Sequence, residues 1–541
     1  MGNDGRARKE PPPEREDGLK IFYGAGLNEN QYPHPAEAAK GSYNFDLRKD
    51  SSFLFPRKPF DLLATADNGA DARGLMQLVK RNDSETSLVQ AGATVYKWDG
   101  GTTFSSVTTL VTSVCQLRDV YWSLGDYIVV TDLQKKQVVS KWDGTTFSAL
   151  TTGLGTSLFA KYGIVHQGRV WLFNVTTSSD TPHLMVASAF ENPESYDTSK
   201  RAVTGTFVTG SEAFYMLTPD LKPINGVGLT LSGDLVVSSE KGRLFKLTGS
   251  SPSDYRWVDF YANSNAVGDE SLVSAGNDIH YMRQGGAIES LLATQNYGDV
   301  AADDLSRWIP DTVRNLTGGI AVYDQQNQKV LWFIAGKVLA LYKDLLYGGC
   351  VIDASGAKQK LSPWSVYQTS HSSGFNVSCA KYMRLPGTSN YTVLFGDSLG
   401  RIYDLNGSGN GDGGNTDISM NRKTRFLGEE VGLDYTKKIP KAKIQYERTQ
   451  QCTVDISLEW GDEYNTSTAS VTLKGPLTGD TAAYFGGANY FNEAVYFNAG
   501  SSAAGVKSHI NTSLVGRGTV VTKTVSSTNR VRYHVDHIEL M

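Results

Sequence analysis

The chain has 541 residues, of which 40% are hydrophobic and 11% aromatic, enough for a sizeable core in two or more domains or in one large propeller. Its 52 Lys and Arg residues against 56 Asp and Glu residues give a net charge of −4. Proteins that bind duplex DNA tightly through its phosphates normally carry a basic excess, so this net charge argues against that class. It is compatible with a surface along which DNA passes without being bound.

The N-terminal part contains no targeting segment that we recognise. Residues 1–18 are charged and proline-rich, and we expect a disordered tail there. They lack the apolar core of a signal peptide, and no window of the chain approaches eighteen consecutive apolar residues, so we expect no membrane anchor. Residues 19–85 mix short strand and turn signals, which predict an N-terminal β segment before the first blade.

A six-residue motif then recurs along the chain. VYKWDG at 95–100 returns as VSKWDG at 139–144, which places Trp98 and Trp142 44 residues apart. Related motifs are LFKLTG at 244–249 and IYDLNG at 402–407. A repeat of about 40–45 residues with strand-like content is typical of a β-propeller blade. We therefore predict a structural repeat, and the residues that mark it are Trp98, Trp142, Phe245 and Tyr403.

The strand signals predict a β-propeller over residues 86–405. Runs of Val, Ile, Tyr, Phe, Trp and Thr are separated there by Gly, Asn, Asp or Ser, as hairpins require. At the observed spacing this segment accommodates about seven blades. Trp98 and Trp142 fall at equivalent blade positions, which favours packing between blades over a cage for a ligand.

One segment departs from the strand pattern. Residues 300–316 have apolar side chains at helical spacing after an acidic start, which predicts a short amphipathic helix between blades. These apolar residues are Leu305, Trp308, Ile309, Val313 and Leu316. Pro310 is expected to kink or end the helix.

A glycine-rich stretch at 406–416 predicts a linker. Residues 417–541 beyond it alternate apolar and polar side chains, which predicts an antiparallel β-sandwich. The linker also places oxygen ligands at the intervals of a calcium loop, but its last position is Asn instead of a bidentate Glu, and we favour the linker and predict no metal. The loop residues are Asp404, Asn406, Ser408, Gly409, Asn410, Asp412 and Asn415.

Other candidate sites have structural explanations that we favour. His534, Asp536 and His537 cannot converge on a metal from one strand without a bulge, so a surface strand is expected. Asp462 and Glu463, beside Glu459 and Trp460, resemble a glycosidase carboxylate pair, but a charged turn explains them as well. The basic clusters at 422–425 and 437–443 lack interleaved aromatics and are expected to face solvent or a neighbouring subunit. We therefore predict no catalytic residue and no enzymatic activity.

Four cysteines are scattered along the chain. None of them has the paired spacing of a metal or redox site, so we expect small buried hydrophobic side chains in a reducing compartment and no cofactor. They are Cys115, Cys350, Cys379 and Cys452.

The order of five short segments along the chain bears on the family of the protein. They are GLNEN…AAKGSYNFDLRKDSSFLFPRKPF near the start, ENPESYDTS at 191–199, DLVVSSEKGRLFKLTG at 234–249, GDSLGRIYDLNGSGNGDGG at 396–414 and KTRFLG at 423–428. This order resembles a tail protein family of short-tailed bacteriophages, called tail tubular protein B, the nozzle, or the packaged-DNA stabilisation (tail hub) protein. The chain departs from the family at 341–367, where an insertion bears on the blade count.

The resemblance implies a structural virion protein that is assembled in the host cytoplasm and resides in the phage tail. It implies a homohexameric ring below the head-to-tail adaptor or portal-side proteins, which extends the DNA channel, retains the packaged genome and supports fibres or spikes for host attachment until DNA ejection. Genomic DNA would pass through this ring without specific binding. The alternatives are a monomeric propeller that binds carbohydrate or a cell-surface receptor, and a glycosidase on the same architecture.

Overall fold

The computed structural model describes most of the chain up to residue 424 and eight strand segments beyond it. The described residues are 26–30, 38–47, 55–66, 68–154, 156–197, 212–230, 233–261, 265–268, 270–276, 278–291, 303–334, 336–348, 350–352, 358–369, 376–408, 411–413, 416, 418–424, 437–439, 442–447, 452–460, 466–473, 507–512, 516–518, 521–527 and 534–540. The chain divides into two compact units. The propeller unit contains Lys58–Asp344 and Val366–Thr416, and the second unit combines Met1–Arg57, Leu345–Ser365 and Asp417–Met541.

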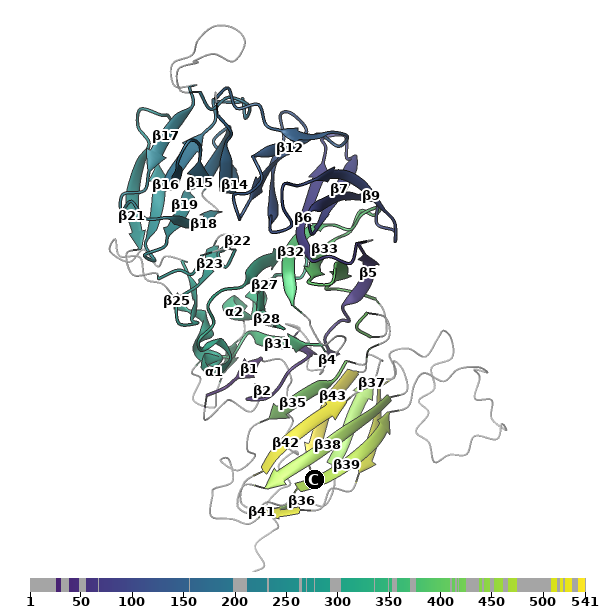
Figure 1. Ribbon diagram of the computed structural model, residues 1–541. Helices are drawn as coiled ribbons and strands as arrows, with labels where there is room; N and C mark the ends of the chain where they lie inside the picture. Colours follow the sequence, from purple (N-terminus) through teal and green to yellow (C-terminus); the bar gives the residue numbers. More distant parts are fainter. Residues whose placement is uncertain are drawn as a thin grey trace, which may run out of the picture. The chain divides into compact units, whose positions relative to one another are not determined.

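The propeller has seven four-stranded antiparallel sheets, which we name blades A to G in the order of their first strands (Figure 1). Blade A contains β6 (Ala72–Val79), β7 (Glu85–Ala91), β8 (Thr94–Trp98) and β9 (Phe104–Thr109). Blade B contains β10 (Leu117–Trp122), β11 (Tyr127–Asp132), β12 (Ser140–Trp142) and β13 (Phe147–Ala149). Blade C contains β14 (Phe159–His166), β15 (Arg169–Thr176), β16 (Asp180–Ala187) and β17 (Phe214–Leu217).

The remaining blades repeat this pattern. Blade D contains β18 (Ile224–Leu229), β19 (Leu235–Ser239), β20 (Leu244–Thr248) and β21 (Arg256–Tyr261). Blade E contains β22 (Val273–Ala275), β23 (Asp278–Met282), β24 (Ile288–Ser290) and β25 (Asp303–Asp304). Blade F contains β26 (Ile320–Asp324), β27 (Lys329–Ile334), β28 (Lys337–Tyr342) and β31 (Trp364–Gln368). Blade G contains β32 (Val377–Arg384), β33 (Tyr391–Asp397), β34 (Arg401–Asp404) and β5 (Asp61–Thr65).

Blade G closes the ring with a strand from the opposite end of the propeller sequence. Its outermost strand, β5, pairs with β34, so that Leu62 opposes Tyr403 and Ala64 opposes Ile402. The first strands of successive blades contact one another around the ring, including β32 of blade G against β6 of blade A. Each blade stays a separate sheet whose first and fourth strands are its edges, and the first strands are protected by the neighbouring blades that they contact. The prediction of about seven blades is confirmed. The propeller begins at β5, ahead of residue 86, where the sequence analysis placed its start.

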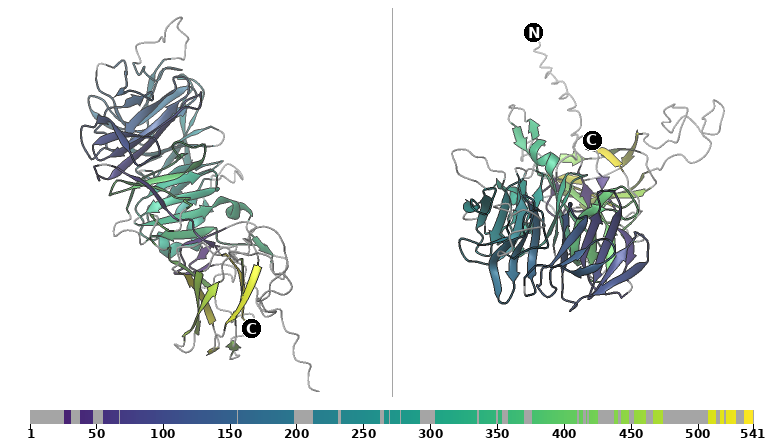
Figure 2. Two further views of the ribbon diagram at one scale, coloured as in Figure 1. Left: turned by 90° about the vertical axis from the view of Figure 1, so that its right-hand side faces the viewer. Right: turned by 90° about the horizontal axis from the view of Figure 1, so that it is seen from above.

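The cores lie between blades. The second strand of a blade is covered on both faces and is therefore largely buried: every residue of β27 (KVLWFI) and of β19 (LVVSS) is buried. Outer strands are partly exposed, and β17 alternates half-buried and exposed side chains. Separate buried clusters join blade G to A, A to B, B to C, C to D and D to E. Figure 2 shows the blades from two further sides.

The expected helix at 300–316 is replaced by two shorter helices between blades E and F. A 3-10 helix, η1 (Leu305–Trp308), is capped by Asp304, whose Oδ1 accepts a hydrogen bond from the Ser306 amide at 2.8 Å. Pro310 then begins α1 (Pro310–Val313), because its missing N–H costs nothing at the first helical position. Four of the five apolar residues are buried, namely Leu305, Trp308, Ile309 and Val313, whereas Leu316 is half-buried.

The insertion at 341–367 lies within blade F and leaves the blade count unchanged. It contains α2 (Lys343–Gly348) and a hairpin of β29 (Cys350–Ile352) and β30 (Lys358–Lys360) between the third and fourth strands of that blade. No helix of the described residues is long and apolar enough to cross a membrane.

The second unit contains several sheets. A six-stranded sheet has the order β1 (Leu27–Asn28), β2 (Ala38–Ala39), β35 (Met420–Thr424), β42 (Val521–Ser527), β38 (Cys452–Trp460) and β39 (Thr466–Leu473). A three-stranded sheet has the order β40 (Lys507–Thr512), β37 (Ala442–Glu447) and β43 (His534–Leu540). Three pairs remain: β3 (Phe45–Asp46) with β4 (Phe55–Pro56), β36 (Lys437–Ile439) with β41 (Gly516–Gly518), and the hairpin of β29 with β30. The packing of these sheets as a β-sandwich stays a prediction.

Candidate functional site

The four residues that mark the repeat all lie in third strands of blades. Trp98 is on β8, Trp142 on β12, Phe245 on β20 and Tyr403 on β34, and none of them is more than 1% exposed. They occupy two positions of the six-residue motif: the tryptophans take the fourth, and Phe245 and Tyr403 take the second. All four are therefore closed to a ligand arriving from solvent.

The tryptophans pack between blades. Trp98 of blade A belongs to a buried cluster with Met383, Leu394 and Ile402 of blade G. Trp142 of blade B belongs to the equivalent cluster with residues of blade A. The Trp98 indole also stacks on Phe104, with ring centroids 6.2 Å apart, and its Nε1 donates to the Gly101 carbonyl at 2.7 Å. These contacts are those of a structural residue.

The glycine that ends the motif turns the third strand into the fourth. Gly100, Gly144 and Gly249 have φ values of 90°, 99° and 106°, which residues with a Cβ rarely adopt. A Cβ at Gly100 would lie 2.5 Å from the Pro386 carbonyl oxygen. The backbone angle thus requires glycine in these three copies of the motif, and at Gly100 and Gly249 the space requires it as well.

We expect Gly100→Ala to lower the free energy of unfolding by about 2–4 kcal/mol, because the substitution combines a left-handed backbone with a backbone clash. The neighbouring Gly101 provides the control, since a Cβ there meets nothing within 4 Å. Gly101→Ala should change stability by less than about 1 kcal/mol. Urea unfolding followed by tryptophan fluorescence measures both, and equal effects would contradict this account of the motif.

The third position of the motif carries lysine in three of the four copies, and each lysine forms an ion pair. Lys97 lies 3.6 Å from Asp99, Lys141 lies 2.5 Å from Glu194, and Lys246 lies 2.6 Å from Asp234. The fourth copy has Asp404 instead, whose Oδ1 accepts hydrogen bonds from Thr392 Oγ1 and the Asn406 amide. Burial raises the pKa of this carboxyl above its usual value.

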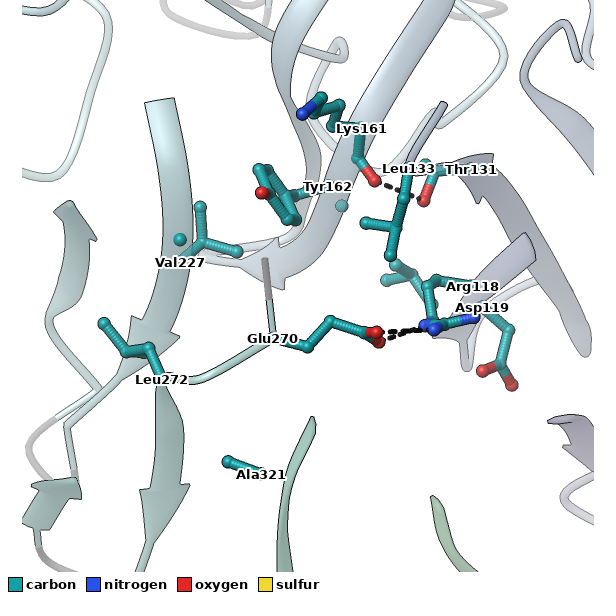
Figure 3. Close-up of a pocket in the computed structure, with 13 residues that line it drawn as sticks. Arg118, Asp119, Thr131, Leu133, Lys161, Tyr162, Val227, Glu270, Leu272 and Ala321 are labelled. Atoms are coloured by element: carbon teal, nitrogen blue, oxygen red, sulfur yellow. Dashed lines mark hydrogen bonds and ion pairs between the residues drawn. The ribbon is translucent and has the colours of Figure 1, made fainter. Parts of the chain in front are cut away.

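The centre of the propeller contains a cavity of about 200 Å³ that is crossed by an ion pair (Figure 3). Arg118 on β10 of blade B faces Glu270, which precedes β22 of blade E. The Arg118 Nη2 to Glu270 Oε2 distance is 2.5 Å, and the Arg118 Nε contacts the other carboxylate oxygen. Burial opposes the charge on Arg118, but Glu270 outweighs it and holds the pKa of the guanidinium above its usual value.

A second ion pair lies next to the first. Asp119, which follows Arg118 on β10, pairs with Lys381 on β32 of blade G. Its Oδ2 also accepts a hydrogen bond from the Gln77 amide of blade A at 3.0 Å. Sequence analysis did not find these four charged residues, because the members of the pairs are 152 and 262 positions apart and share no local motif.

Another polar cavity, of about 490 Å³, lies at the seam between blades A and G. Its wall includes Glu85, Ser87, Arg384 and Thr388. Glu85 is held by hydrogen bonds from Gln77 Nε2 at 2.8 Å and Ser87 Oγ at 2.7 Å, and its other oxygen lies 4.0 Å from Arg384 Nε. The cavity therefore presents two carboxylates, those of Glu85 and Asp99, together with one guanidinium and several hydroxyl groups.

The calcium-loop residues are used in other contacts where the structure describes them. Asp412 Oδ1 accepts a hydrogen bond from the Phe60 amide at 2.9 Å, and the Ser408 amide donates to Asp61 at 2.7 Å. Gly409, Asn410 and Asn415 lie outside the described residues. Among the described residues, no three His, Cys, Asp or Glu side chains are grouped as a metal would require.

The C-terminal candidates lie in or beside strands of the second unit. Asp462 and Glu463 lie outside the described residues, while Glu459 and Trp460 end β38. His534, Asp536 and His537 are all on β43, where the pairing with β37 shifts in register. The strand therefore contains the irregularity that the sequence analysis required for these residues to converge.

The basic clusters both fall on strands of the second unit. Residues 422–424 lie on β35, and 437–443 span β36 and the start of β37. Arg422 is fully buried, with its guanidinium 5.0 Å from the centre of the Phe45 ring. One member of the first cluster is thus an interior residue and not part of a surface for nucleic acid.

Two of the cysteines are free and buried. Burial raises the pKa of the Cys115 thiol to about 11 and of the Cys379 thiol to about 12. Because an unfolded thiol ionises near pH 8.5, unfolding at higher pH releases protons that the folded chain retains. This contribution to stability is complete below about pH 8.5 and is lost as the pH rises toward 11–12.

We therefore expect stability to fall above about pH 8.5, by up to about 1.4 kcal/mol per pH unit for each thiol. Urea unfolding midpoints at a series of pH values measure the slope. The variant Cys115→Ala/Cys379→Ala is the control, and its slope between about pH 8.5 and 9.5 should be shallower. An unchanged slope would show that neither thiol retains its proton in the folded state.

Comparisons with known proteins add little to this description. No family model and no curated protein matches the chain. Among solved structures, it is similar to YCF48 from Cyanidioschyzon merolae, with 13% identity over 64% of this chain and 98% of that chain and a TM-score of 0.39. It is also similar to the WD40 β-propeller domain of Doa1, with 11% identity over 64% and 96% of the two chains and a TM-score of 0.38.

A further similarity is to Raptor from Chaetomium thermophilum, with 9% identity over 64% of this chain and 29% of that chain and a TM-score of 0.40. These values support no inference about activity. The class of the protein follows from its own sheet order: it is an all-β protein with a seven-bladed β-propeller.

Proposed function

We propose that this protein is a structural component of a short bacteriophage tail, where copies of the chain form a nozzle or hub ring. The observation that carries the proposal is the order of the tail-family segments along the sequence, from GLNEN near the start to KTRFLG after the glycine-rich stretch. The ring extends the DNA channel, retains the packaged genome and supports fibres or spikes until ejection.

A closed propeller suits this mechanical role. Its strands are paired within seven blades that pack around a full ring, and the last blade is completed by β5 from the N-terminal side, so that the ends of the propeller sequence are joined in one sheet. A closed ring of identical subunits uses two different patches on each copy, repeated around the axis. A resemblance to the nozzle family sets the number of subunits in the proposal at six.

Ring formation is tested with the purified full-length chain. Light scattering and negative-stain imaging are expected to show rings with six-fold symmetry, either alone or after addition of the head-to-tail adaptor of the same phage. A chain that stays monomeric in both conditions contradicts the proposal. Omitting the adaptor is the control that separates spontaneous assembly from templated assembly.

The proposal also constrains the charge of the channel. DNA slides past a neutral or negative wall without sticking, so the loops that face the channel are expected to be neutral or acidic. Duplex DNA at physiological salt should accordingly show no retention by the protein in a filter-binding assay. A lumen lined by Lys and Arg in the assembled ring would contradict this part of the proposal.

A second candidate function is carbohydrate binding by the single chain, and the cavity between blades A and G favours it. The Glu85 carboxylate is fixed in position by Gln77 and Ser87, and hydroxyl groups of Thr388 and Ser389 line the same space. Such a wall matches the donors and acceptors of a neutral sugar. The exposed aromatic residues are spread over three blades: Tyr121 lies in blade B, Phe190 and Tyr215 in blade C, and Tyr391 in blade G.

Saturation-transfer NMR with a panel of hexoses and N-acetylhexosamines tests this second function. Binding is expected to be lost in Glu85→Gln and retained in Asp126→Asn, whose carboxylate lies outside the cavity. No transfer to any sugar of the panel would exclude the site for monosaccharides.

A further inference from the structure

We propose that two ion-pair bridges seal the central hole of the propeller and clamp together blades that are not neighbours in the ring. We also infer, on the basis of the proposed function, that DNA passes through the opening enclosed by the ring of subunits. It does not pass through the sealed central hole of any one propeller. The clamp itself depends only on the geometry of the chain.

The first bridge spans the hole. Blades B and E are separated by two other blades in a ring of seven, so Arg118 and Glu270 approach from nearly opposite sides. The guanidinium is also anchored to the backbone: Nη1 donates to the Arg73 carbonyl at 2.9 Å and to the Leu117 carbonyl at 2.7 Å. A bidentate ion pair whose guanidinium also donates to backbone carbonyls fixes the orientation of the two side chains as well as the distance between them.

Glu270 is held on its own side by backbone contacts. Its φ of 70° lies in the left-handed region, which a glutamate rarely adopts, and its carbonyl accepts a hydrogen bond from the Ala321 amide of blade F at 2.8 Å. Such a conformation persists where surrounding contacts hold it in place. The bridge to Arg118 therefore connects blades A, B, E and F at one point.

The second bridge connects blades G and B past blade A. The Asp119 side chain is only 6% exposed and is shared between Lys381 of blade G and the Gln77 amide of blade A. Because Arg118 and Asp119 are consecutive on β10, both bridges converge on one strand of blade B. Strand β10 is therefore the element that the two bridges share.

Two cavities lie beside the first bridge. The central cavity and a second cavity of about 510 Å³, which opens among the segments that lead into the first strands of several blades, have Leu133 and Glu270 in common. These two side chains therefore border both cavities. The Arg118–Glu270 ion pair lies across the central hole at this place, where an open bore would be needed for DNA.

Cys379 provides a native reporter of the clamp. It is fully buried on β32, two residues before Lys381, and its thiol contacts the Ala72 carbonyl of blade A at 3.0 Å. Loosening the bridges should expose this thiol through local opening of the seam. Labelling by a neutral maleimide, followed by peptide mass mapping, measures the rate at Cys379 separately from the other cysteines.

We expect Arg118→Gln and Glu270→Gln each to speed labelling of Cys379 by about tenfold or more. The exchanged pair Arg118→Glu/Glu270→Arg should return the rate toward that of the parent protein. The matched control is Arg314→Gln, which removes an exposed ion pair with Asp311 at 3.0 Å and should leave the rate unchanged.

Unchanged labelling in both single variants, with circular dichroism unchanged, overturns the clamp. If Arg118→Gln fails to fold, restoration of folding by the exchanged pair supports the clamp, and failure of the exchanged pair overturns it. The DNA statement has its own readout: in images of assembled rings with DNA, density along a propeller axis contradicts it. Absence of rings bears on the proposed function alone, because the labelling experiment uses the isolated chain.

Discussion

Replacing Trp98 by alanine is expected to lower the free energy of unfolding of the propeller by about 3–5 kcal/mol. The side chain is fully buried between blades A and G, and the strands around it are too well paired to collapse into the space that it leaves. Urea unfolding followed by circular dichroism measures the change. Tyr391→Ala is the control, because that ring is 43% exposed, and it should cost about 1 kcal/mol or less.

A comparison of phenylalanine variants sharpens this test. The Trp98 Nε1 donates to the Gly101 carbonyl, whereas the Trp142 Nε1 has no hydrogen-bond partner among the described residues. Trp98→Phe should therefore cost more than Trp142→Phe, which removes a buried donor without breaking a bond. A larger loss for Trp142→Phe would show that the hydrogen bond from Trp98 to Gly101 does not decide the difference between the two positions.

Introducing a charge at Ala64 should open the seam of the ring. Ala64 is 4% exposed on β5, where it opposes Ile402 and packs in the cluster between blades A and G. Ala64→Asp would bury an unpaired carboxylate and is expected to cost more than about 3 kcal/mol. The neighbouring residue on the same strand, Thr65, is exposed, so Thr65→Asp provides a matched control with an expected change below about 1 kcal/mol.

Both variants are compared by thermal unfolding and by hydrogen exchange of blade G. Rapid exchange throughout β34 in Ala64→Asp, with protection retained in Thr65→Asp, is the expected pattern. Equal protection in the two proteins would mean that β5 is dispensable for closing the propeller.

The architecture could be predicted from the sequence because each blade repeats a local pattern. The motif that ends at Gly100, Gly144 and Gly249 combines an interblade side chain with a turn that needs glycine, and both requirements are local. The start of the propeller could not be placed in this way. The pairing of β5 with β34 joins residues more than 300 positions apart, and DLLAT contains no signal that identifies its partner.

The difference between local patterns and long-range pairing also explains which buried residues the sequence analysis found and which it missed. Burial of Leu305 and Val313 follows from their helical spacing, but Pro310 starts a new helix where we expected one to kink or end. Arg118 and Glu270 are ordinary charged residues in sequence, and only the closure of seven blades brings them together. The sites that depend on ring geometry therefore required the structure.

The division of the chain has a mechanical consequence. Because the second unit is assembled from three stretches of sequence, the polypeptide passes between it and the propeller four times. Tension applied to one unit is accordingly shared by four connections, and a protease that cuts any one of them leaves three still attached. Four covalent connections are expected to resist separation of the two units better than a single linker does.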